Sequence, residues 1–210
     1  RGSLAEEVVR VYLDKNHLYE TKTHRQLCTE ILQKYCQENL ITADFLEFEN
    51  ALIEIIEYSK KGILFLLSFG QKSESLKFEF KKSFNITDEE QKNQYKGEID
   101  CLITVGNLKG ILDIKRSKNG IPSKADLFSF KKIQLPFYLS HGPLKINEID
   151  FFGWVSLAES DESMIICKND EMKNSFQGAC DFGPKVLHSL EKENIFLEEW
   201  LKDYTNIEQK

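Results

Sequence analysis

Two aspartates stand on neighbouring predicted strands, in the stretch GEIDCLITVGNLKGILDIKRSKNG that runs from Gly97 to Gly120. Alternating apolar and polar residues on both sides of Gly106-Asn107 predict a β-hairpin with a tight two-residue turn. Pairing the strands around this turn places Asp100 directly opposite Asp113. Like charges that face each other across a sheet are destabilising, so the hairpin needs a group that compensates for two carboxylates.

A divalent cation is one such group. Directly opposed residues have Cβ atoms about 5 Å apart, and two ionised carboxylates at that distance repel unless a cation lies between them or one is protonated. Mg²⁺ binds such oxygen clusters while keeping several of its own waters. Lys115 follows Asp113 on the same strand face, opposite Glu98 in this register. Its ammonium could orient or deprotonate a water, or stabilise charge that develops on a phosphate.

The residues alone leave a second interpretation open, in which Asp100 and Asp113 belong to a salt-bridge network with Lys115 and Arg116. Apolar residues near the middle of the carboxylate face indicate that this face is not simply open to solvent. The other face of the hairpin is predicted to be core, since it holds Ile99, Cys101, Ile103, Val105, Leu108, Leu112 and Ile114.

The N-terminal portion of the chain is predicted to be helical. Apolar residues at helical spacing indicate helices over residues 4–17, 23–39 and 42–62. Thr23 is expected to cap the second helix, a Thr or Asp to cap the third, and Gly62 to end it.

The period then changes to that of strands. Strands are predicted in residues 75–86, 95–104, 108–115, 146–158 and 162–169, a polar loop at 87–94, and helices over 123–140, capped by Ser123, and from Pro184 onward. The expected fold is α/β, with a small mixed sheet of about five strands flanked by helices. We expect a single domain with a helical portion at 1–70, a core at 75–170 and a C-terminal helix at 184–205.

Composition excludes several classes of protein. The net charge of −6 argues against non-specific nucleic-acid binding by the whole surface, although residues 115–132 are locally basic. No apolar run is long enough to span a membrane, and the charged start is unlike a secretory signal. Five scattered cysteines without a CxxC pair predict reduced thiols in a cytoplasmic protein. The four histidines show no metal-ligand spacing and are expected at the surface or its boundary.

Asp followed by Asp-X-Lys on neighbouring strands resembles the PD-(D/E)XK nuclease superfamily, with Asp113-Ile114-Lys115 as the (D/E)-X-K element. The segments GEIDCLI, GILDIKRS and QLPFYL are similar in particular to the RecB/AddB-type branch, which reads Gly-X-Ile-Asp, Asp-Tyr-Lys and Gln-Leu-X-X-Tyr. Gln134 and Tyr138 stand at the positions of that last motif, and their i, i+4 spacing puts them on one helix face. The resemblance covers roughly residues 1–140 and implies a restriction-endonuclease-like core.

The resemblance also implies a metal site. Asp100, Asp113 and the backbone carbonyl of Ile114 would bind one or two Mg²⁺ or Mn²⁺ ions. Glu6 stands where such domains carry a histidine, and its carboxylate can also bind these ions. Glu79 matches the family's glutamate on the first core strand and is a candidate outer ligand. No iron–sulfur cluster is expected, because the cysteines lack closely spaced partners.

The implied function is a Mg²⁺- or Mn²⁺-dependent deoxyribonuclease, an exonuclease in preference to an endonuclease, acting in DNA repair or recombination. Lys115 would activate the attacking water or stabilise the charge that develops on the phosphate. Gln134 and Tyr138 would position the DNA strand or the side chain of Lys115. The expected partners are DNA and a helicase domain or subunit, and the chain could be the C-terminal part of a longer one. The candidate DNA contacts are Arg116, Lys118, Lys124, Lys131 and Lys132.

Two alternatives remain open from the sequence. The first is an inactive copy of the nuclease fold that holds DNA ends or a partner subunit, which the glutamate at position 6 favours and the intact Asp100, Asp113 and Lys115 set opposes. The second is a restriction-type or CRISPR-associated nuclease of the same superfamily.

Overall fold

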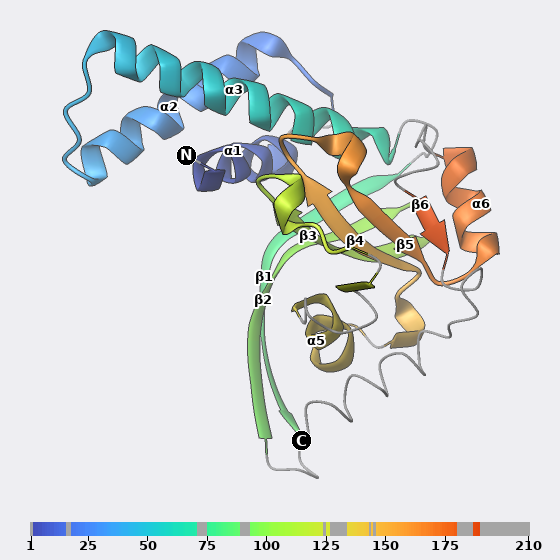
Figure 1. Cartoon of the computed structure of the whole chain (residues 1–210). Coiled ribbons are helices and arrows are strands. Elements are labelled where there is room, and N and C mark those ends of the chain that lie inside the picture. Colours follow the sequence, from blue (N-terminus) through green and yellow to red (C-terminus); the bar gives the residue numbers. More distant parts are fainter. Residues whose placement is uncertain are drawn as a thin grey trace.

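A six-stranded mixed sheet carries helices on both of its faces in the computed structural model of this chain (Figure 1). The structure describes residues 2–15, 18–70, 75–88, 93–123, 125–126, 134–142, 144, 146–179 and 187–189. The helices are α1 (Gly2–Lys15), α2 (Thr21–Glu38), α3 (Phe45–Ser68), α5 (Gln134–His141) and α6 (Asp170–Ala179), with short 3₁₀ turns η1 (Lys118–Gly120), η2 (Ile146–Glu148) and η3 (Ser160–Glu162). The strands are β1 (Leu76–Asp88), β2 (Asn93–Val105), β3 (Leu108–Lys115), β4 (Phe151–Ser156), β5 (Met164–Cys167) and β6 (Leu187–Ser189).

The strands lie across the sheet in chain order. β1, β2 and β3 are antiparallel, β4 is parallel to β3, β5 is antiparallel to β4, and β6 is parallel to β5. The mixed sheet with flanking helices and the helical N-terminal portion confirm the predicted fold class, with six strands where about five were expected.

The central hairpin has the predicted turn, and the predicted register holds as far as the Cys101–Leu112 pair, whereas the expected backbone pair of Asp100 with Asp113 does not form. β2 and β3 pair from Val105 with Leu108 to Cys101 with Leu112, around the two turn residues. Gly106 has a φ of 59°, a conformation that glycine adopts at little cost and that tight hairpin turns require. Its N–H also donates to the carbonyl of Ser75 at 2.8 Å, which ties the turn to the start of β1.

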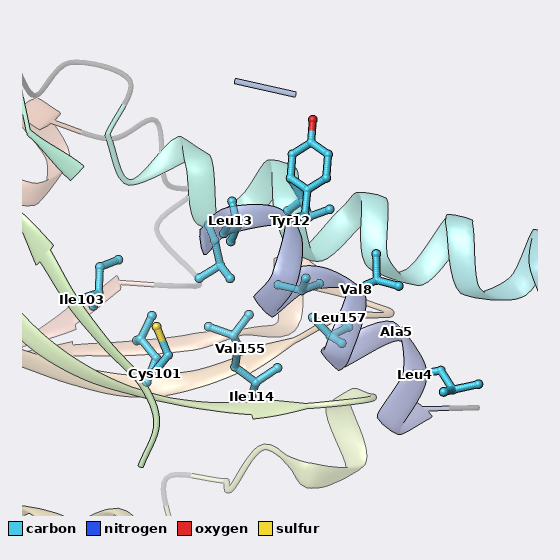
Figure 2. Close-up of a cluster of buried hydrophobic side chains, with 14 of the residues drawn as sticks. Leu4, Ala5, Val8, Tyr12, Leu13, Cys101, Ile103, Ile114, Val155 and Leu157 are labelled. Atoms are coloured by element: carbon cyan, nitrogen blue, oxygen red, sulfur yellow. The ribbon is translucent and has the colours of Figure 1, made fainter. Parts of the chain in front are cut away.

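One face of the sheet is covered by α1 and α3. Figure 2 shows α1 lying between α3 and the strands of this core, with the ring of Tyr12 pointing away from the strands. The apolar residues of α1 are buried and belong to the same core as Cys101 and Val155. This layer fixes the position of every other residue of α1, including the polar ones at its edge.

The opposite face of the sheet carries α5. Phe84, Ile99 and Trp154 of the strands form a second core with Leu135 and Tyr138 of this helix. β1 and β2 run on together beyond β3 and curve past α5 (Figure 1).

The prediction that Ile99 shares a face with Cys101 is wrong, because Ile99 packs in the α5 core and Cys101 in the α1 core. The two residues flank Asp100, so β2 changes the face it presents at that aspartate. Across from it, Lys81 of β1 has a φ of 52° in the left-handed region, and the ladder skips the pair it would form with Asp100. The backbone distortion at Lys81 accompanies the change of face.

Two predicted helix ends were also wrong. α3 continues through Gly62 to Ser68, because glycine there allows a close approach: a Cβ on Gly62 would lie 2.4 Å from Leu157 Cδ2. α2 begins at Thr21 with Glu20 as its N-cap, where Thr23 was expected. Asp44 does cap α3, in a capping box with Glu47.

The C-terminal part differs from the expected single helix. Residues 170–179 form α6, which was not predicted, and residues 187–189 form β6 inside the expected helix at 184–205. The rest of that expected helix lies outside the described residues. Ser123 does cap a helical start, since its Oγ accepts from the Asp126 N–H at 3.2 Å.

No helix among the described residues is long and apolar enough to cross a membrane. Cys28, Cys36, Cys101 and Cys167 form no disulfide within the described residues, and Cys180 lies outside them.

Candidate active site

The candidate site lies where β2 separates from β3, at a fork that begins immediately after the Cys101–Leu112 pair. Asp100 is the first β2 residue beyond the pairing, and its Oδ2 accepts the Ile114 N–H at 3.0 Å. A side-chain oxygen therefore occupies the place where the next β2 backbone carbonyl would bind. The expected pairing of Glu98 with Lys115 does not form, because Glu98 pairs with Ser83 of β1 and β2 has already left β3.

Asp113 is the most buried charged group of the site, with a residue exposure of 1%. It lies on β3 beside Trp154 of β4, whose position in the second core explains the exclusion of water. Asp113 Oδ2 is 2.7 Å from Lys115 Nζ, so the two side chains form a close ion pair. Apart from Lys115 and the neighbouring Asp100, the Asp113 carboxyl group has no polar partner among the described residues. A buried carboxyl group with a single counter-charge and a second carboxyl beside it calls for an explanation in a folded protein.

The pKa of Asp113 is raised from 3.8 to about 7. Burial is the main cause, since it penalises the charged form, and the nearby Asp100 carboxylate adds to the increase. Lys115 acts in the opposite direction and lowers the pKa. The arrangement therefore holds one carboxyl group whose proton is easily gained or lost near neutral pH.

Lys115, Gln134 and Tyr138 form a hydrogen-bonded chain that connects β3 to α5. Lys115 Nζ donates to Gln134 Oε1 at 3.2 Å, and Gln134 Nε2 donates to the Tyr138 hydroxyl at 2.9 Å. Gln134 is the first residue of α5, and Pro136 is tolerated in the same first turn because its missing N–H would have no helical acceptor there. Burial raises the pKa of Tyr138, with Asp100 and Asp113 contributing in the same direction. The structure thus brings together five of the residues that the sequence nominated.

Glu6 of α1 reaches the same region from the other face of the sheet. Its pKa is raised first by burial and then by the charge of Asp100, while Lys81 and Lys115 lower it. A carboxylate nearly a hundred residues away in the sequence is therefore within electrostatic range of the fork.

The donor set fits a hard divalent cation in part. Two carboxyl groups, those of Asp100 and Asp113, meet at the fork. The carbonyl of Lys115 accepts from Leu157 N–H on the β4 side, so the alternating carbonyl of Ile114 points to the β2 side, where the fork opens. In the described part of the chain, no three His, Cys, Asp or Glu side chains converge closely enough to hold a metal ion. Waters would complete the ligand set of two carboxylates and one carbonyl.

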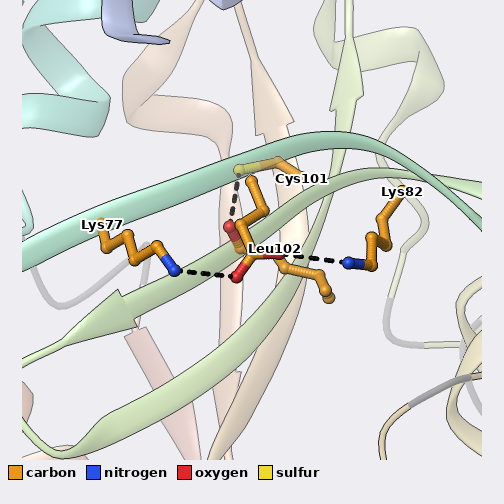
Figure 3. A network of polar contacts seen from close by, with 5 residues as sticks. Lys77, Lys82, Cys101 and Leu102 are labelled. Carbon is orange, nitrogen blue, oxygen red and sulfur yellow. Dashed lines mark hydrogen bonds and ion pairs between the residues drawn. The ribbon is translucent and has the colours of Figure 1, made fainter.

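Glu79 does not join the candidate metal ligands at the fork. Its carboxylate lies 3.3 Å from Lys77 Nζ and 3.4 Å from Lys82 Nζ, and Figure 3 marks the contacts of these two lysines. The hydrogen bond from Lys77 is the largest cause of the lowered pKa of Glu79. The carboxylate is thus already neutralised by two lysines of β1.

The predicted DNA contacts have different outcomes. Arg116 binds Glu54 of α3 at 3.0 Å and lies over the ring of Tyr58, so it braces β3 against α3. Lys118 is exposed, and its backbone N–H donates to Glu159 at 3.0 Å. Lys124, Lys131 and Lys132 lie outside the described residues.

Two basic residues near the site were missed by the sequence interpretation. Lys81 lies across from Asp100 and, with Arg10, acts on the charge of Glu6. No salt bridge joins Lys81 to any described residue, although Lys77 and Lys82 are both paired with Glu79. Local sequence gave no signal for Lys81, because its place beside Asp100 depends on the pairing of β1 with β2.

His24 also departs from its expected surface position, since it is fully buried in the helical layer.

No protein-family model matches this chain, and no match is found among curated proteins.

Proposed function

We propose that this chain is a metal-dependent DNA nuclease of the RecB/AddB type, which hydrolyses phosphodiester bonds in DNA repair or recombination as part of a helicase–nuclease. The observation that carries the proposal is Asp113, a buried carboxyl group beside Asp100 whose counter-charge is Lys115 at 2.7 Å. Two carboxyl groups held beside each other, one of them buried, are costly for a fold even with one lysine as counter-charge, so a bound cation is the simplest reason for keeping them.

Asp100, Asp113 and the carbonyl of Ile114 would hold Mg²⁺ or Mn²⁺, and the charge of Glu6 would add to the negative potential there. When bound there, the ion would supply positive charge that activates water and stabilises the attacked phosphate. Lys115 would hold its ammonium toward the reacting group, because Gln134 fixes the end of the side chain by a hydrogen bond. Tyr138 would in turn fix the amide of Gln134.

The free basic side chains near the fork would bind the DNA backbone. Lys81 fits this role, because it has no salt bridge within the described residues and lies across from Asp100. Lys118 lies three residues beyond the end of β3, at the start of η1, and is exposed. An ammonium that is not already paired can neutralise a phosphate without first breaking an internal contact. An exonuclease would use these contacts to guide a strand end to the fork.

A nuclease assay on end-labelled linear single- and double-stranded DNA tests the proposal, with Mg²⁺, Mn²⁺ or EDTA. We expect metal-dependent cleavage, and a loss of at least about 100-fold in rate for Asp113→Ala and Lys115→Ala. Lys82→Ala is the matched control and should cleave normally, because Lys82 is paired with Glu79 on β1. A covalently closed circular substrate should remain intact if the activity is exonucleolytic.

Calorimetric titration with Mn²⁺ supplies a second readout. The wild-type chain should bind Mn²⁺, and Asp113→Ala should bind it more weakly. The absence of metal-dependent cleavage by the wild-type chain would contradict the proposed activity. DNA binding without cleavage would instead support the inactive nuclease-fold module.

A further inference from the structure

Four large apolar side chains are exposed at the end of the helical hairpin formed by α2 and α3, which projects away from the sheet (Figure 1). Their exposed fractions are 91% for Leu40, 45% for Ile41, 81% for Phe45 and 67% for Leu46. We call these four residues the apolar tip. Apolar side chains are common at surfaces one at a time, but a contiguous exposed cluster is typical of an interaction site.

Leu40 carries two energetic costs for the folded chain. Its φ is 53°, in the left-handed region where glycine is the usual residue after a helix. The N–H of Leu40 donates to Gln37 and that of Ile41 donates to Cys36, so the backbone forms the helix end that glycine normally provides. A leucine there costs roughly 1–2 kcal/mol, and its exposed side chain gains almost nothing from burial. The side chain therefore needs a reason outside this fold.

The backbone of Phe45 and Leu46 is fixed although their side chains contact little of the core. They are the first two residues of α3, directly after the Asp44 cap. The capping box between Asp44 and Glu47 fixes this first turn, with hydrogen bonds of 2.8 Å and 3.2 Å. An exposed aromatic side chain on a backbone that is already fixed costs no further backbone entropy on binding, which favours its use as an interface anchor.

The surroundings of the apolar tip are acidic. Between residues 34 and 49 there are four acids, Glu38, Asp44, Glu47 and Glu49, and one base, Lys34. Ion pairs of 3.8 Å join Glu38 to Lys34 and Glu49 to Arg25, whereas the two capping-box acids have no salt bridge within the described residues. The charge next to Phe45 is thus negative.

We propose that the apolar tip is a docking site for another protein, whose surface offers an apolar groove bordered by lysine or arginine. The apolar anchors would fill the groove, and the acids at the cap would meet its basic rim. An anionic membrane fits less well because it would be repelled by the acids. A second copy of the chain docked tip to tip would bring like charges together. This proposal does not depend on the nuclease activity.

The test is a selection of displayed random peptides against the wild-type chain, followed by affinity measurement with the enriched peptides. We expect enriched peptides that combine aliphatic or aromatic residues with Lys or Arg. Leu40→Gly and Phe45→Ala should each weaken their binding at least tenfold, and Glu38→Lys should weaken it as well. Leu40→Gly should melt at the same or a higher temperature than wild type, because glycine relieves the left-handed backbone. Loss of binding without loss of stability separates docking from folding.

Leu18→Ala is the matched control, since Leu18 is 83% exposed outside the apolar tip and its replacement should leave the affinity unchanged. Four outcomes would overturn the proposal. They are a failure to enrich any peptide, equal binding of the enriched peptides by wild type and Leu40→Gly, tip-dependent binding of phosphatidylcholine vesicles, and a concentration-dependent dimer that Phe45→Ala abolishes. The last two would assign the apolar tip to a membrane or to a second copy.

Discussion

Asp113 shows how a single buried carboxyl group can couple folding to pH. Its neighbours are apolar on the β4 side, where Trp154 lies, and Lys115 provides a counter-charge at 2.7 Å. Burial still dominates, and the pKa of Asp113 is raised to about 7. The residue is therefore neutral in part of the pH range where most carboxyl groups are charged, and its ionisation should be visible in stability measurements.

We predict that the free energy of unfolding loses a contribution from Asp113 as pH rises from about 4 to 7. The folded chain holds a proton that the unfolded chain, with the usual pKa of 3.8, has already released, so each step up in pH favours unfolding. The loss is of the order of up to 4 kcal/mol. The test is urea denaturation of wild type and Asp113→Asn in EDTA at pH 5 and at pH 8. The free energy of unfolding of the variant minus that of wild type should be larger at pH 8 than at pH 5. A difference between the two proteins that does not change with pH would contradict this.

Lys81 supports a second prediction at the same scale. Replacement by Asn removes the charge while accepting the φ of 52°, since asparagine tolerates the left-handed region. If Lys81 contacts a DNA phosphate, Lys81→Asn should bind DNA more weakly, and the slope of log affinity against log salt should fall by about 1. Fluorescence anisotropy in Ca²⁺ measures both quantities. Lys82→Asn should have a smaller effect because Lys82 is paired with Glu79, and equal losses in the two variants would rule out a special contact at Lys81.

Among the secondary-structure elements, the separation of β2 from β3 at the fork creates the site. A fully paired hairpin would cover the Ile114 backbone with β2, whereas here Asp100 takes its N–H. α5 then supplies Gln134 from one face, and α1 supplies Glu6 from the other. The elements are held by two separate cores, so each can be tested by itself.

The helical layer is fastened by His24, which joins α2 to its neighbours. Its Nε2 lies 2.8 Å from Ser59 Oγ on α3, and its Nδ1 lies 2.9 Å from the Tyr19 hydroxyl. Burial, and then the charge of Lys60, lower the pKa of His24 from 6.5 to about 4. Protonation of this imidazole thus opposes folding.

We predict that the helical layer loses stability as pH falls from 6.5 through about 4. The unfolded chain binds a proton on His24 in this range and the folded chain does not, so acid favours unfolding, by roughly 3 kcal/mol at most. His24→Gln should be less stable at pH 7 but should lose this part of the pH dependence. Thermal melting followed by circular dichroism between pH 4 and 7 measures it, and an unchanged acid slope in the variant would argue against this role.

At the scale of the whole molecule, the sequence was most informative where the signal was local. The turn at Gly106, the register up to Cys101 and the shared face of Gln134 and Tyr138 follow from spacing alone. The mixed sheet and its helical layer follow from the change in hydrophobic period.

The remainder depends on contacts between distant segments. The fork at Asp100 and the change of face at Ile99 arise from the pairing of β1 with β2, which strand alternation cannot reveal. α3 passes through Gly62 because of packing against Leu157, although a helix-ending glycine was a reasonable local inference. The burial of His24 requires Ser59 of a different helix.

The position of the fork between two packed layers has a consequence for how the site matures. Glu6, Asp100 and Gln134 come from the first, middle and later parts of the chain, and they meet only after α1 and α5 have both settled on opposite faces of the sheet. A partly folded molecule with α5 detached would admit water to Asp113, and the pKa of that carboxyl group would return toward its ordinary value. The site at the fork therefore forms only when the whole domain is folded.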